Sequence, residues 1–200
     1  MFWFHVALYA HILGIVALTF ALFSESSTVL TLRRAQRSDA ALREAVLRLD
    51  RNEFYKMVSG VVLLASGGYM TYRISAVPGW LIVSLVVFFI MAAQGGPALA
   101  YVKKSLARID DRPPGGRTAQ YRALAGWWYL PTGAFVGLGA MAALVALMIF
   151  TPGAGASVVV AAVCMAVGAC CAAALPRLER REHAAAAAQG GAAEAALPSD

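Results

Sequence analysis

The chain is built from long runs of hydrophobic residues, the first of which extends from Phe2 to Leu32. About 30 residues at roughly 1.5 Å per residue form a helix of about 45 Å, longer than the hydrocarbon core of a bilayer at about 30 Å. Four more runs pass the same length test, so the sequence predicts membrane spans at about residues 4–30, 56–73, 80–101, 131–150 and 157–176. The predicted fold class is therefore all-α, a polytopic transmembrane bundle of five helices.

Composition supports a bilayer as the solvent of this chain. Hydrophobic residues make up 60% of the 200 residues and charged residues only 14%, whereas a soluble domain has nearer a quarter of its residues charged. The N-terminus has no Lys or Arg before the first run, and no small-residue cleavage site closely follows a short apolar core. We therefore expect the first span to be retained rather than removed as a signal peptide.

The basic residues are sorted to alternate connections between the predicted spans. Of the 17 Lys and Arg residues, all but Arg73 lie in the first connection, the third connection or the start of the C-terminal tail. Short loops rich in Lys and Arg stay in the cytosol, so the pattern predicts an N-out, C-in chain and requires an odd number of spans. The predicted bundle covers residues 1–181, with cytosolic connections at 33–55 and 103–126 and a flexible cytosolic tail at 182–200. The net charge of +6 comes from basic residues that hold these connections on the cytosolic side of the membrane. No nucleic-acid partner is therefore predicted.

The first cytosolic connection has its own helical pattern. Ser38 can cap a short helix on which Leu42, Val46 and Leu49 share one face. We expect this helix to lie on the inner membrane surface against acidic lipid headgroups. The alternative is a solvated helix that links the first two spans.

Spans four and five are rich in small residues at helical spacing. The residues concerned are Gly133, Gly137 and Ala140 in span four, and Ala162, Ala166, Cys170 and Ala174 in span five. Small residues let helix backbones approach closely in lipid, where close packing drives association. The pattern predicts a tight bundle or an interface with a second copy of the chain or another membrane subunit.

His11 is the sharpest candidate for chemistry. It lies about nine residues, or roughly 13 Å, inside the outer end of span one, where an ionisable side chain needs a partner in the bundle interior. One interpretation is a neutral histidine hydrogen-bonded to a neighbouring helix. The other is a ligand of haem iron or copper, with Met141 and Met165 at comparable depth as candidate cofactor-binding residues. The sequence shows no metal cluster, because its three cysteines form no Cys-x-x-Cys motif.

Glu25 is the acid that lies inside a predicted span. It is close to the inner surface, at a level that Lys56, Lys103 and Lys104 also reach. We expect a structural ion pair that closes the cytosolic end of the bundle. The alternative is a proton or ion gate, since intramembrane acids often mark such paths.

Three short motifs carry a family resemblance: His-Ile-Leu-Gly at 11–14, Leu-Arg-Arg-Ala at 32–35 and Met-Ile-Phe-Thr-Pro at 148–152. Over about residues 5–152 the chain resembles a bacterial family of predicted integral membrane proteins of unknown function. That family is distantly similar to the copper-resistance D domain and to the HemJ-type protoporphyrinogen oxidase, which are compact helical bundles with a histidine on an early span. The resemblance implies a multi-pass protein of the bacterial inner membrane and points to His11 as a ligand.

These observations leave three functional hypotheses. The first is a b-type haem or redox role with His11 as axial ligand. The second is a non-catalytic accessory or assembly subunit of a larger membrane complex, because no complete catalytic constellation is present. The third is a copper or small-solute permease that uses His11, Glu25 and the methionines. No catalytic residue and no enzymatic reaction is assigned.

Overall fold

The structure is a computed structural model that describes residues 2–33, 39–73, 77–110, 127 and 129–195. Several side chains inside the helices, including those of Lys103 and of residues 177–195, lie outside the described part. The described residues form five helices, which are α1 (Phe2–Arg33), α2 (Asp39–Tyr72), α3 (Gly79–Asp110), α5 (Tyr129–Phe150) and α6 (Ala154–Ala195). The all-α class is confirmed, and each predicted span coincides with part of one of these helices to within one residue.

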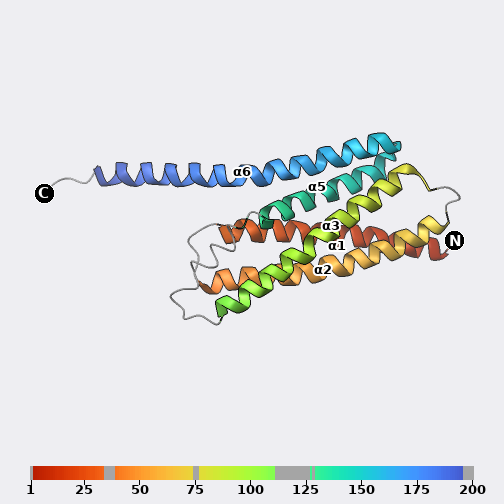
Figure 1. The fold of residues 1–200 in the computed structure, drawn as a ribbon, viewed down its shortest axis with the longest axis horizontal. Coiled ribbons are helices and arrows are strands. Elements are labelled where there is room, and N and C mark those ends of the chain that lie inside the picture. Colours follow the sequence, from red (N-terminus) through yellow and green to blue (C-terminus); the bar gives the residue numbers. More distant parts are fainter. Residues whose placement is uncertain (1, 34–38, 74–76, 111–126, 128, 196–200) are drawn as a thin grey trace.

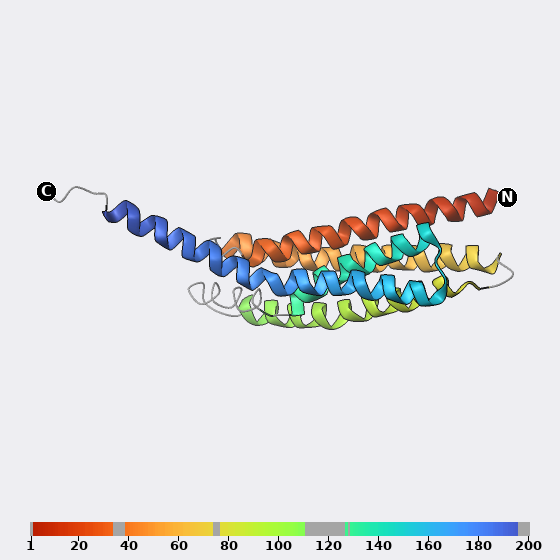
Figure 2. The same cartoon turned by 90° about the horizontal axis from the view of Figure 1, so that it is seen from above.

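The helices run antiparallel in sequence order, side by side along one long axis (Figures 1 and 2). The end of α1, the start of α2, the end of α3 and the start of α5 lie at the same end of the bundle, and the last part of α6 extends beyond that end (Figure 1). The two connections that are rich in Lys and Arg therefore leave from one end. The N-terminus and the two short connections lie at the other end.

Three of the helices are long and apolar enough to cross a membrane, over Phe2–Thr31, Tyr129–Phe150 and Ala154–Pro176. A shorter apolar stretch, Gly79–Gln94, begins α3. Large apolar side chains lie on the outside of the bundle, and Phe20 and Phe23 are 74% and 67% exposed. Such continuous apolar surface is typical of a protein surrounded by lipid.

The core lies where all five helices meet, near the middle of the bundle. Its buried members are Leu18 and Leu22 of α1, Leu63 of α2, Val87 of α3, Ala140, Met141, Ala143 and Leu144 of α5, and Ala161 of α6. Leucine and alanine dominate this set, so the helices interlock through side chains of moderate and small size. Each of the five described helices thereby contributes to this cluster.

The short surface helix expected in the first connection is not a separate element. Residues from Asp39 onward belong to α2, which continues without a break to Tyr72, and Val46 and Leu49 are buried in the bundle. The physical reason is that α2 has buried or half-buried residues at a spacing of three or four, which are Val46, Leu49, Asn52, Lys56 and Ser59. One continuous stripe therefore packs α2 along α1, and the prediction of a helix on the membrane surface was wrong. The proposed cap, Ser38, lies outside the described residues.

Helices α5 and α6 approach each other through two glycines. A Cβ atom added at Gly139 would lie 2.3 Å from the carbonyl oxygen of Cys164, and one added at Gly168 would lie 2.3 Å from that of Phe135. Both distances are too short for a carbon and an oxygen, so only glycine permits this contact. Close packing of these helices was expected, but the residues that achieve it differ from the small residues singled out in span five.

The small-residue stripe of span five faces outward. Ala162, Ala166, Cys170 and Ala174 are all exposed. In span four, by contrast, Ala140 is buried in the core. The predicted interface of α6 with a second copy or another subunit stays a prediction.

Helix α5 ends at a strained residue. Thr151 has a φ of 40°, and among the described residues it is the non-glycine with a positive φ. Its amide donates a hydrogen bond of 3.0 Å to the carbonyl of Leu147, which closes the last turn. A β-branched residue is unfavourable in this conformation.

Candidate functional site

A buried ion-pair cluster joins α1 and α2. The ammonium of Lys56 lies 2.8 Å from Oε2 of Glu25, and it also contacts Oε2 of Glu53 one turn earlier on its own helix. The side chains of Lys56 and Glu25 are only 14% and 15% exposed. A charge that is removed from water is costly without partners, so the shared lysine stabilises both carboxylates in this buried position.

Hydrogen bonds beside the cluster fix the register of the two helices. Asn52 donates from Nδ2 to Oγ of Ser24 at 3.1 Å. Ser26 and Thr28 donate to backbone carbonyls one turn earlier in α1, at 3.0 Å and 2.7 Å. Hydroxyl groups in apolar helices satisfy their hydrogen-bonding potential in this way. The serine- and threonine-rich end of α1 can therefore be buried, with Glu25 directed at α2.

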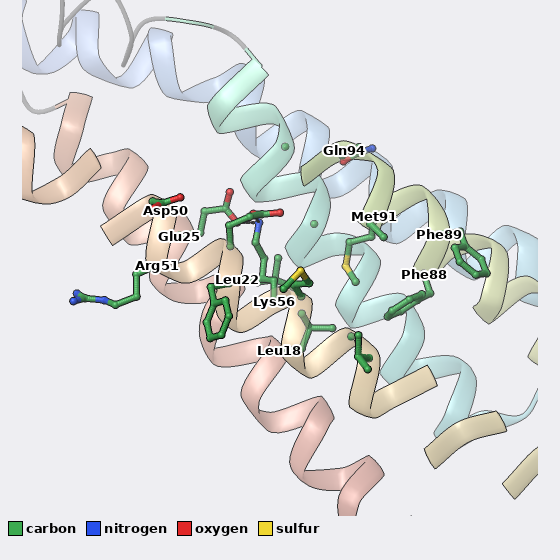
Figure 3. A pocket seen from close by; sticks show the side chains of 18 of the residues that line it. Leu18, Leu22, Glu25, Asp50, Arg51, Lys56, Phe88, Phe89, Met91 and Gln94 are labelled. Atoms are coloured by element: carbon green, nitrogen blue, oxygen red, sulfur yellow. Dashed lines mark hydrogen bonds and ion pairs between the residues drawn. The ribbon is translucent and has the colours of Figure 1, made fainter. Parts of the chain in front are cut away.

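A cavity of about 830 Å³ opens beside this cluster. Its floor is formed by Leu18, Leu22 and Glu25 of α1 and by Leu130, Gly133 and Gly137 of α5, and its sides by residues 50–64 of α2 and 88–94 of α3. Figure 3 shows Glu25 and Lys56 meeting at one part of the cavity, while Phe88 and Met91 reach toward it from α3. The cavity therefore combines a charged end with a long apolar wall.

The space in the cavity depends on small residues. A Cβ atom added at Gly133 would have no neighbour within 4 Å, so this part of α5 borders open space. At Gly60, by contrast, a Cβ atom would lie 3.3 Å from the ring of Phe88, where α2 and α3 come close. Gly133 therefore borders the open part of the cavity, and Gly60 lies at one of its edges.

Aromatic rings line the same end of the bundle at the start of α5. The ring of Trp127 lies 3.9 Å from that of Tyr101 and stacks on that of Tyr129 at 5.2 Å between centroids. The hydroxyl of Tyr129 donates to the carbonyl oxygen of Gln94 at 3.1 Å, and both of these residues line the cavity. Aromatic residues of this kind are typical of the membrane–water interface.

His11 lies at the contact between α1 and α2, away from the cavity. Its Nδ1 is 3.0 Å from Oγ of Ser66, and that hydroxyl donates its proton to the carbonyl of Val62 at 2.6 Å. This hydrogen bond joins α1 to α2 at the level of His11. A Cβ atom added at Gly67 would lie 3.2 Å from the ring, so the imidazole packs directly on the backbone of α2.

Two of the three candidate cofactor ligands, Met141 and Met165, lie in or against the core. Met141 is 3% exposed and lies in the core with Leu18 and Leu144, while Met165 packs against the outside of that core. A porphyrin could not reach the sulfur of Met141 without displacing core side chains. No group of three or more His, Cys, Asp or Glu side chains suited to a metal ion occurs among the described residues. The roles of His11, Met141 and Met165 as cofactor ligands stay predictions.

The structure brings Glu25 and Lys56 together and adds two partners that the sequence analysis did not include. Glu53 precedes Lys56 by three residues, a spacing that places both side chains on one helix face and could have been recognised. Ser66 offers no such indication, because it is 55 positions from His11 and resembles any other serine in an apolar helix. The side chain of Lys103, the remaining candidate for the ion pair, lies outside the described residues.

Comparison of the chain with models of protein families, with curated proteins and with solved structures found no significant match.

Proposed function

We propose that this protein is a five-span inner-membrane protein that binds a drug-sized amphiphile in the cavity between α2 and α3. The observation that carries the proposal is the composition of the cavity wall, with Glu25 and Lys56 at one end and Val61, Leu64 and Phe88 along its length. A volume of about 830 Å³ lies within the range of roughly 300–1,000 Å³ typical of small-molecule pockets. The polar group of the ligand would contact the charged cluster, and its apolar part would lie along α2 and α3.

The arrangement of the helices supports five crossings. Helices α2 and α3 run antiparallel to each other alongside the apolar α1 and α5 (Figures 1 and 2), so a bilayer that surrounds α1 and α5 also surrounds much of their length. The Lys- and Arg-rich connections leave from one end, which favours that end as cytosolic. The charged end of the cavity would then lie near the inner surface of the membrane.

Reporter fusions test this orientation. A reporter that is active only outside the cytosol should be active when fused after Val77 and inactive when fused after Asp110 or at the C-terminus. Activity of the same reporter at both Val77 and the C-terminus would contradict an N-out, C-in chain with five spans.

Photolabelling tests the binding site. Protein in nanodiscs is exposed to a long-chain alcohol that carries a diazirine, and labelled peptides are mapped by mass spectrometry. Labelling around Val61 and Phe89 should saturate and be displaced by unlabelled alcohol, whereas labelling of the lipid-facing Phe20 should rise in proportion to concentration.

A substitution that fills the cavity provides the decisive comparison. Gly133→Leu should abolish the saturable labelling, because its side chain enters the open space beside α5. Gly68→Leu is the matched control, since Gly68 also has no neighbour within 4 Å of an added Cβ atom but does not line the cavity. Saturable labelling that survives Gly133→Leu, or that is absent in the wild type, would refute the proposed site.

A further inference from the structure

We infer that the amphiphile bound in this cavity is a lipophilic organic cation, an inference that rests on the proposed function. The charges of the cavity lining lead to it. Among the described residues, Glu25 and Glu53 share the ammonium of Lys56, which leaves one negative charge in the cluster. The other two charged lining residues, Asp50 and Arg51, have opposite signs and do not alter this balance.

The geometry leaves room for a second cation at the carboxylates. Both contacts with Lys56 are made through Oε2, so each carboxylate has another oxygen with acceptor lone pairs of its own. Arg51 is exposed and points away from Glu25 and Lys56 (Figure 3). Its guanidinium therefore does not neutralise the remaining negative charge of the cluster. Because the side chains of Glu25 and Lys56 are nearly removed from water, an uncompensated charge acts more strongly there than at the surface.

The apolar wall offers the second element that a lipophilic cation requires. Phe54, Phe88, Phe89 and Tyr129 line the cavity. The face of an aromatic ring attracts an organic cation, and this attraction increases when the pair is shielded from water. Neither the carboxylates nor the rings would favour an anionic amphiphile, since Lys56 is already held by two acids.

Three photoreactive amphiphiles with the same hydrocarbon chain test the inference. Their head groups are a trimethylammonium, a hydroxyl and a sulfonate, and the protein is held in nanodiscs of phosphatidylcholine only. Labelling around Phe20 corrects each probe for its partition into the bilayer. We expect half-saturation of the cavity by the cation at a mole fraction about tenfold or more below that of the alcohol, a difference of about 1.4 kcal/mol, and no saturable labelling by the sulfonate.

Glu53→Gln isolates the contribution of charge. This substitution leaves the pair of Glu25 with Lys56 intact but makes the cluster neutral, so the preference for the cation should fall about tenfold. Glu44→Gln is the matched control, because Glu44 is an exposed acid of the same helix that pairs with Arg48 and does not line the cavity. It should leave the preference unchanged.

The outcomes separate this inference from the proposed function. Equal saturation by the cation and the alcohol, or a preference unaffected by Glu53→Gln, overturns the inference and leaves amphiphile binding in place. The absence of saturable labelling by every probe overturns both. If Glu53→Gln does not fold, the comparison of the three probes on the wild type decides the inference.

Discussion

Two glycines of α5 should respond to the same substitution with opposite changes in stability. Gly139 touches the backbone of α6, where an added Cβ atom would lie 2.3 Å from the carbonyl oxygen of Cys164. Gly133, six positions earlier, faces open space. Gly139→Ala therefore perturbs the contact between α5 and α6, and Gly133→Ala perturbs only the helix in which it lies.

The magnitudes follow from the local geometry. Alanine in a helix interior is favoured over glycine by about 0.5–1 kcal/mol, so Gly133→Ala should stabilise the protein by about that amount. At Gly139 the distance must lengthen from 2.3 Å to at least 3.0 Å, and the obstacle is a backbone oxygen that cannot rotate away. Overpacking of this kind costs roughly 1–3 kcal/mol. We take a cost from the upper part of that range and subtract the gain of alanine over glycine. Gly139→Ala should then lower the free energy of unfolding by about 1–2 kcal/mol.

Reversible unfolding measures both effects in one assay. Each variant is titrated with sodium dodecyl sulfate in mixed micelles, and the loss of helix is followed by circular dichroism. Gly168→Ala, which meets the carbonyl oxygen of Phe135 from the other helix, should match Gly139→Ala. A Gly139→Ala variant as stable as Gly133→Ala would refute the close contact between α5 and α6.

Further predictions concern the charged cluster, the histidine and the end of α5. Lys56→Met leaves two carboxylates without their shared cation in a buried position and should lower the free energy of unfolding by about 3–5 kcal/mol. Adding Glu25→Leu should recover much of this loss in the same unfolding assay. No recovery in the double variant would exclude charge imbalance as the cause. Ser66→Ala removes the hydroxyl partner of His11 Nδ1 and should cost about 1 kcal/mol, so an unchanged midpoint would contradict that hydrogen bond. Thr151→Gly relieves a positive φ and should stabilise by about 1 kcal/mol, whereas Thr151→Ala should give no such gain.

The candidate site was only partly accessible from the sequence. Counting residues along antiparallel spans placed Glu25 level with Lys56, and the structure has these two side chains in contact. The cavity could not be anticipated, because its 21 lining residues come from four helices and most are ordinary apolar side chains. A cavity is defined by where side chains fail to fill space, which depends on how the helices pack and not on any one of them.

The sequence by itself determined the helical class, the approximate positions of all five helices and the sorting of basic residues to one end. These features are local, since they depend on the length of apolar runs and on the cost of moving a charge through lipid. Only the tertiary structure decided that α2 continues through the expected surface helix, that Gly139 and Gly168 bring α5 and α6 together, and that Lys56 is shared by two acids. Each of these features depends on which face of one helix meets which face of another. Helices that are apolar on nearly all sides do not specify that choice through their hydrophobic pattern, so it is made by the packing of small residues and by a few buried polar contacts.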